Sequence, residues 1–338
     1  MRGRVLSWLG LLVSAAAIII LVRTFDVEAA ARALGRAEPG WLLLAAVAYT
    51  LLFPLRGLRW SRLLQPVKAI SVESATLVFA VGFMANNVMP ARLGDLARAV
   101  VLAKKEGLST STTVSNIGLE RIFDGLTVVG ILLGVLAFAP PGAAWVEQVA
   151  WGMGGLFLGA VCFAGFLAHS EGPALALVSL VLRPLPQRIS EPIMGILKRL
   201  GHGLHVLRSA RQTAEVLLLS IAVWALEIVV YVLVGRALGL DVPVHGMALI
   251  MAVLTLGLTA PSAPAFVGVF EGLVIAAIGL YGVGAPEAPA FAIAMHLIHF
   301  LPGTLLGAAA SWRLGLKVRE LKAPAAAAPA IDAGYAEP

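Results

Sequence analysis

Three arginines are the residues of this sequence best suited to bind an anion. Each lies beside a break or the start of an apolar segment, and an aspartate accompanies them. Arg92, Asp95 and Arg98 follow the interruption of an apolar segment at Pro90, and Arg121 stands at the start of the next apolar run. A guanidinium group can hold a phosphate through two parallel, charge-assisted hydrogen bonds. These residues therefore predict a phosphate site. The alternative is that they are ordinary cytoplasmic arginines that mark topology.

Acidic side chains accompany these arginines. Glu120 and Asp124 are four residues apart, so a helix places them on one face. We expect them to pair with the arginines; the alternative is that they bind a coupling proton or cation. Asp95 is expected to orient one arginine. Glu227 falls inside a later apolar run and is predicted to be a charge partner or an ion-coupling group; the alternative is a neutral acid bonded to a neighbouring helix. Glu271 is expected to cap or pair a second helix break.

Two groups of residues indicate where helices are broken: Asn86, Asn87, Pro90 and Gly94 in the first half, and Pro264 and Gly268 in the second. We expect the asparagines to bond backbone groups that the break exposes. His296 and His299 lie three apart in the last apolar run; hydrogen-bonded packing is the default interpretation, with a proton role as the alternative. A metal would need further ligands that the sequence does not supply, so neither a metal nor a cofactor is expected.

Composition decides the class of protein. Hydrophobic residues make up 59% of the chain and charged residues 13%, and the mean hydropathy is +0.92. A soluble domain needs a polar surface, whereas several runs here reach the roughly 20 residues that span a bilayer. We predict an all-α polytopic membrane protein. The net charge of +6 is explained by cytoplasmic Lys and Arg, and no nucleic-acid partner is expected because no such binding motif is present.

About six apolar runs are predicted to cross the membrane: Val5–Val22, Trp41–Leu55, Ile117–Ala139, Val149–Ala168, Glu215–Leu238 and Ala288–Ser311. Two further pairs are predicted to form re-entrant helical hairpins: Val72–Met89 with Ala91–Lys105, and Val244–Thr259 with Phe266–Tyr281. An apolar stripe predicts an amphipathic interfacial helix at about 188–208. We expect one transmembrane domain over 1–322 and a disordered Ala/Pro-rich tail over 323–338.

The distribution of Lys and Arg predicts the orientation. These residues gather in Met1–Arg4, Arg56–Ser115, His169–Ala214 and Arg313–Lys322, whereas Pro140–Gln148 and Gly282–Glu287 contain none. The positive-inside rule then places both termini in the cytoplasm. The expected location is the cell inner (cytoplasmic) membrane.

The two halves of the chain show weak internal similarity. Pro90-Ala-Arg-Leu-Gly94 recurs as Pro264-Ala-Phe-Val-Gly268, and the order of elements matches, which predicts repeat units at about 41–168 and 215–311. Chance similarity between apolar stretches is the alternative. An odd number of crossings between the units would invert the second. Inverted repeats with broken helices that meet near the midplane are typical of transporters.

The motif Asn87…Pro90-x-Arg92-x-Gly94-Asp95-x-x-Arg98, with Glu120-Arg121-x-x-Asp124 after it, resembles the flippase-like transmembrane domain of lysylphosphatidylglycerol synthases. Pro264…Gly268…Glu271 fits the second half of that pattern. The resemblance covers roughly Val5 to Leu316 and implies an integral membrane protein that translocates lipid. In the family the last span often carries a Tyr/Arg pair where this chain has His296 and His299. The soluble aminoacyl-transferring domain is absent here, so lipid aminoacylation is not expected.

The function expected from these features is a lipid flippase or transporter that moves an anionic phospholipid or a polyprenyl-phosphate lipid. No Walker motif is present, so transport would be passive or ion-coupled. One alternative is a membrane-embedded lipid-modifying transferase, although no catalytic constellation is found and we do not expect an enzyme. Another is a non-catalytic membrane partner of a lipid-modifying enzyme. The sequence does not specify the lipid or the oligomeric state.

Overall fold

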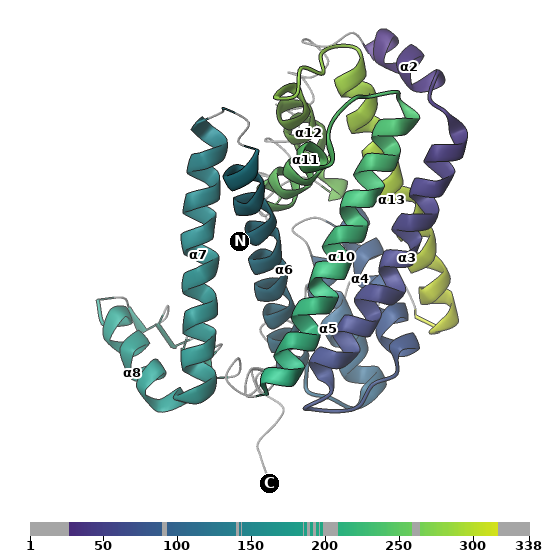
Figure 1. Ribbon diagram of the computed structural model, residues 1–338. Coiled ribbons are helices and arrows are strands. Elements are labelled where there is room, and N and C mark those ends of the chain that lie inside the picture. Colours follow the sequence, from purple (N-terminus) through teal and green to yellow (C-terminus); the bar gives the residue numbers. More distant parts are fainter. Residues whose placement is uncertain are drawn as a thin grey trace.

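The computed structural model describes residues 27–89, 93–139, 142, 144–184, 186–187, 190–191, 194–195, 197–198, 209–258 and 264–316. Regular structure in these residues is helical throughout, as expected. The first helices are α2 (Val27–Gly35), α3 (Pro39–Leu64), α4 (Val72–Val88), α5 (Leu93–Glu106), α6 (Thr110–Phe138) and α7 (Ala144–His169). They are followed by α8 (Glu171–Leu182), α10 (Ala210–Ala237), α11 (Val244–Gly257), the 3₁₀ turn η3 (Pro264–Phe266), α12 (Val269–Gly279) and α13 (Glu287–Arg313) (Figure 1).

Four helices of the described chain are long and apolar enough to cross a membrane: α3, α6, α10 and α13, with 26 to 29 residues each. A helix of 26 residues is about 39 Å long, which exceeds the roughly 30 Å of a bilayer core. They correspond to four of the six predicted spans. Val149–Ala168 lies within α7. Val5–Val22 and the tail lie outside the described residues, as does most of the expected interfacial helix at 188–208.

The predicted C-terminal boundary of the second span is wrong. Trp41–Leu55 was expected to be followed by a cytoplasmic connector, but α3 continues to Leu64. Arg56 and Arg59 therefore lie inside the helix, and the side chain of Arg59 is only 1% exposed. Carboxylates on neighbouring helices compensate these charges, which is why the helix need not end before them. Two other connectors also contain helices, α2 and α8.

Serine residues cap three helices, and in two of them, α6 and α10, the helix begins before the predicted apolar run. Ser71, Ser109 and Ser209 each accept a hydrogen bond from the backbone N–H three residues later. Such caps satisfy amide groups that the first turn leaves without partners. As a result, α6 starts at Thr110 rather than Ile117, and Glu120 lies within the helix rather than at its head.

The long helices form a bundle with two shorter pairs at its ends. α10 lies along α3, α4 packs between α3 and α13, and α6 lies beside α7. In Figure 1, α11 and α12 lie near the upper end of the long helices and α5 near the lower end. Large apolar side chains stay exposed on the outer faces of α3, α10 and α13, where lipid can cover them: Leu43, Leu51, Leu218, Leu301 and Leu305.

The first break joins α4 to α5 through a close backbone contact. The side chain of Asn86 accepts a hydrogen bond of 2.8 Å from the backbone N–H of Gly94, so Asn86 has the expected role. Asn87 does not: its amide donates to α13, at 2.9 Å from Thr304 Oγ1 and 3.4 Å from the Phe300 carbonyl. Pro90 and Arg92 lie outside the described residues.

α13 carries small residues where α4 crosses it. Gly303 and Gly307 are one helical turn apart, and Phe83, Met84 and the carbonyl of Ala80 occupy the space that a Cβ atom would need. Small residues at this spacing let two membrane helices approach until their backbones touch. The α4–α5 pair is therefore held against α13.

The second break has an unusual backbone. Ala265 and Phe266 have positive φ angles of 56° and 60°, and Gly268 has a φ of 85°. The carboxylate of Glu271 accepts a hydrogen bond of 2.7 Å from the N–H of Gly268 and so caps α12. This is the capping role expected of Glu271. Pro264 opens the preceding 3₁₀ turn, as a helix-break residue should.

Replacing Gly94 by alanine should destabilise the α4–α5 pair. A Cβ atom there would lie 2.1 Å from the carbonyl oxygen of Gly82 and 2.5 Å from the backbone nitrogen of Asn86. Backbone atoms cannot rotate away, so we expect a loss of about 1–3 kcal/mol, typical of overpacking. The matched control is Gly130→Ala in α6, where a Cβ meets nothing within 4 Å. Thermal unfolding of the detergent-solubilised variants checks this; equal unfolding temperatures would contradict it.

Candidate functional site: a charged cavity between the two helix breaks

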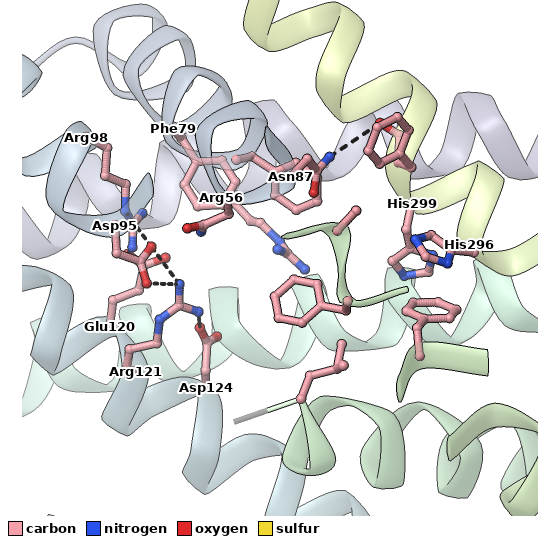
Figure 2. Close-up of a pocket in the computed structure, with 17 residues that line it drawn as sticks. Arg56, Phe79, Asn87, Asp95, Arg98, Glu120, Arg121, Asp124, His296 and His299 are labelled. Atoms are coloured by element: carbon pink, nitrogen blue, oxygen red, sulfur yellow. Dashed lines mark hydrogen bonds and ion pairs between the residues drawn. The ribbon is translucent and has the colours of Figure 1, made fainter. Parts of the chain in front are cut away.

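A cavity of about 170 Å³ lies where the two broken segments meet. One part of its lining is charged: Arg56, Asp95, Arg98, Glu120, Arg121 and Asp124. Another part is aromatic: Phe79, Phe83, Phe266, Phe270 and Phe300. Asn86, Asn87, His296 and His299 also line it. Figure 2 shows the acids and arginines on one side, the histidines on the other, and the Arg56 side chain extending between them.

Arg121 is the most accessible arginine of the charged side. One of its nitrogens, Nη2, lies 2.9 Å from each carboxylate oxygen of Asp95, and Nη1 lies 3.6 Å from Asp124. The side chain is 48% exposed. Asp95 therefore orients Arg121, as the sequence predicts. An arginine that is held by aspartates but open to the cavity can exchange a carboxylate for an arriving phosphate.

Arg98 is buried behind Arg121, with a side chain that is 1% exposed. It forms ion pairs with Glu120 at 2.9 Å and with Asp95 at 3.3 Å. Its guanidinium lies over the rings of Trp60 and Phe79, 4.9 and 5.1 Å from their centroids. Nη1 of Arg98 has no hydrogen-bond partner in the described structure. A buried donor of this kind is costly to leave unsatisfied, so an anion at this end of the cavity would gain a partner.

Sequence reasoning missed Arg59, which holds the acidic pair of α6. Its Nη2 lies 2.9 Å from Glu120, and Nη1 contacts Asp124 and, at 3.2 Å, the hydroxyl of Ser220. Glu120 and Asp124 were expected to pair with arginines of the first hairpin. Glu120 does so through Arg98, but both acids also bind this arginine of α3. The spacing Arg56-x-x-Arg59-x-x-Arg62 continues the helical period and could have indicated it.

Glu227 has charged and polar partners on other helices, which agrees with its interpretation as a charge partner and not with the alternative of a neutral, isolated acid. Its Oε2 lies 2.8 Å from Arg56 Nη2, and its Oε1 lies 2.8 Å from His299 Nε2. A guanidinium at this distance favours the ionised carboxylate. Glu227 itself is buried and does not line the cavity, whereas its partner Arg56 does.

Both histidines of α13 are hydrogen bonded. His296 Nδ1 contacts the carboxylate of Glu271, and its ring stacks on Phe270 with centroids 4.6 Å apart. His299 Nδ1 lies 2.8 Å from the carbonyl oxygen of Met295. Within the described residues, no group of three His, Cys, Asp or Glu side chains is placed to hold a metal ion.

The structure thus gathers most of the predicted site residues around one cavity. Asp95, Arg98, Glu120, Arg121 and Asp124 line it directly. Gly94 donates a hydrogen bond to the lining residue Asn86. Glu227 and Glu271 bind the lining residues Arg56 and His296.

Comparison with known proteins places the sequence in context. The family described as "Lysylphosphatidylglycerol synthase TM region" matches residues 7–307. A protein named "Glycosyltransferase AglD" from Haloferax volcanii is 28% identical over 295 residues, which cover 78% of this chain and 47% of that protein. This chain therefore spans about half the length of that relative. A "UPF0104 membrane protein" from Methanothermobacter thermautotrophicus is 25% identical over 351 residues, with 94% and 97% of the two chains covered.

Proposed function

Because the chain belongs to the lysylphosphatidylglycerol synthase transmembrane-region family and has several helices able to cross a membrane, we propose that it moves an anionic lipid between the two leaflets. The lipid would be a phospholipid or a polyprenyl-phosphate lipid. The observation that carries this proposal is the cavity at the helix breaks. It presents three arginines and three carboxylates among helices that are long and apolar enough to cross a membrane. Ionisable groups in such surroundings are expensive and by default indicate a pathway for a polar substrate.

Because the charges around the cavity are balanced, a phosphate would bind there reversibly. Three arginines pair with three carboxylates on the charged side: Arg59, Arg98 and Arg121 with Asp95, Glu120 and Asp124. Arg56 pairs with Glu227. An arriving phosphate would displace the Asp95 carboxylate from Arg121 instead of meeting an unpaired cation. The displaced carboxylate then competes for Arg121 when the phosphate leaves. A carrier needs this weak, exchangeable binding because it must release its cargo on the far side.

The lipid would travel with its headgroup in the cavity and its acyl chains outside the bundle. The aromatic residues of the lining offer an uncharged surface to the glycerol or isoprenoid carbons next to the phosphate. The exposed leucines of α3 and α13 border lipid on the outer faces. Transport of the chains through the protein is therefore not required.

A second candidate function is a lipid-binding part in a glycosyl- or aminoacyl-transferring system. The similarity to the protein named "Glycosyltransferase AglD" favours it. In that case the cavity would hold an acceptor lipid without moving it. Binding without translocation distinguishes this candidate from the first.

The test is lipid translocation in phosphatidylcholine vesicles that contain a trace of fluorescent phosphatidylglycerol. Dithionite destroys only outer-leaflet fluorophore in protein-free vesicles, so we expect further loss of signal when the purified protein is present. Fluorescent glucosylceramide, which lacks a phosphate, is the matched control and should not be moved. Equal signal loss with and without protein would contradict transport. Equal movement of both lipids would contradict phosphate recognition.

A further inference from the structure

His299 is placed so that both of its ring nitrogens face hydrogen-bond acceptors. Nδ1 lies 2.8 Å from the Met295 carbonyl oxygen, and Nε2 lies 2.8 Å from Oε1 of Glu227. A carbonyl oxygen can only accept, so Nδ1 must carry a hydrogen. The contact between Nε2 and Glu227 then needs a second proton, either on the ring or on the carboxyl group.

Arg56 decides where that second proton rests. Its Nη2 lies 2.8 Å from the other oxygen of Glu227, and this ion pair favours the carboxylate. The Glu227–His299 contact therefore holds one proton, and Arg56 directs it toward the imidazole side of that contact. Arg56, Glu227 and His299 together then carry one net positive charge. Arg56 and His299 both line the cavity, so this charge acts on whatever enters it.

Among the groups that surround the His299 ring, Glu227 is the one placed to share a proton with it. From α3, Tyr49 lies 4.7 Å away between ring centroids, together with Arg56. From α10, Tyr231 lies 5.9 Å away, beside Glu227 itself. From α12, Phe270 lies 5.5 Å away, and Glu271 is held by the N–H of Gly268 and by His296. Of these groups, Glu227 is the carboxylate bonded to His299.

His296 provides an internal contrast. Its Nδ1 faces the Glu271 carboxylate, and a neutral imidazole with its hydrogen on Nδ1 satisfies that contact. No second proton is demanded there. The contacts of His299 therefore require an extra proton, whereas those of His296, the other histidine of the cavity lining, do not.

We propose that the protein carries one proton together with each lipid phosphate and that His299 is the group that binds this proton. The proposal rests on the proposed lipid transport. Arg59, Arg98 and Arg121 balance Asp95, Glu120 and Asp124, so the proton on His299 provides the positive charge that an anionic phosphate neutralises. When the Nε2 proton passes to water at the open side, the Nε2 lone pair faces the Glu227 carboxylate. The contact loses its hydrogen bond, the cavity loses its positive charge, and the phosphate leaves on the same side as the proton. The negative charge of the phosphate and the positive charge of the proton cancel in each cycle.

The test imposes a pH gradient across phosphatidylcholine vesicles that contain fluorescent phosphatidylglycerol, with K⁺ and valinomycin fixing the membrane potential. The lipid should accumulate in the leaflet on the alkaline side. One pH unit corresponds to about 1.36 kcal/mol, so the final ratio between leaflets should approach about tenfold per pH unit. Changing the potential at constant pH should leave the ratio unchanged because the cycle moves no net charge.

Wild-type protein alone separates the two ideas. If it moves lipid but the leaflets stay equal under a pH gradient, proton coupling is wrong and lipid transport stands. If it moves no lipid, both are wrong. Accumulation that follows the gradient supports both.

Variants then test the assignment to His299. His299→Gln can still donate a hydrogen bond but holds no titratable proton, so lipid should distribute equally whatever the gradient. His245→Gln makes the same change at an exposed position and should keep the wild-type ratio. His296→Gln should also respond to the gradient, whatever its rate. A His299→Gln protein that still builds the gradient-driven ratio would overturn the assignment.

Discussion

Replacing Arg59 by methionine should lower the free energy of unfolding by about 3 kcal/mol or more, because it leaves buried carboxylates without their main partner. Arg59 contacts both Glu120 and Asp124 and is 1% exposed. Arg98 and Arg121 retain part of the compensation at 2.9 and 3.6 Å. The expected loss is therefore at the lower end of the range for a broken buried pair. Thermal unfolding in detergent, with size-exclusion profiles, measures it.

Two further variants make the Arg59 result specific. The triple variant Arg59→Met, Glu120→Gln, Asp124→Asn removes the stranded charges and should recover much of the lost stability, because neutral groups are cheaper to bury. Arg62→Met lies three residues further along α3, and its pair with Glu215 at 3.0 Å is about 40% exposed. It should cost less than about 1 kcal/mol. Equal losses for Arg59→Met and Arg62→Met would contradict a buried charge network.

Replacing Arg121 by alanine should slow lipid translocation by about 10- to 100-fold while the protein still folds. Hydrogen bonds to charged groups are worth about 1.5–3 kcal/mol, and each 1.36 kcal/mol is about tenfold in rate. Folding should survive because the Arg121 side chain is 48% exposed and exposed pairs contribute little. Glu120 is not stranded by this change, since Arg59 and Arg98 hold it.

Two control variants accompany Arg121→Ala: a conservative replacement at the same position and an alanine replacement of a distant arginine. Arg121→Lys keeps the charge but loses the forked geometry, so its rate should fall between wild type and Arg121→Ala. Arg313→Ala removes an arginine whose pair with Glu73 at 2.6 Å is exposed on both sides, and it should leave the rate unchanged. Equal rates for wild type and well-folded Arg121→Ala would mean that Arg121 only marks topology. Arg92, predicted from the same motif, can be tested by the same pair of replacements.

Much of the architecture could be predicted from the sequence because it follows from local rules. Apolar length predicted the four candidate spans of the described residues, and Pro and Gly predicted where the helices break. Helix starts were harder, since serine caps at Ser109 and Ser209 extend α6 and α10 into polar sequence. The inverted arrangement of the repeats stays a prediction. The four candidate spans and the two helix pairs are compatible with it.

The site was harder to predict because its partners come from distant parts of the chain. The acids of α6 were recognised, but Arg59 was assigned to a cytoplasmic connector because basic residues after a span usually lie there. Glu227 was recognised as a candidate charge partner, but its partners could not be named because Arg56 and His299 lie on two other helices. Local pattern shows which residues are chemically unusual. Only the packed structure shows which of them meet.

The glycine contact between α13 and α4 determines which parts of the molecule can move. Gly303 and Gly307 lie against Phe83 and Met84, and Asn87 donates a hydrogen bond to Thr304, so we expect α4 and α13 to move as one unit. Because α5 packs on α4, this unit should include α5. We therefore expect alternating access to arise from the segments on the other side of the cavity. There, η3 and the start of α12 contain a strained, left-handed backbone that can act as a hinge.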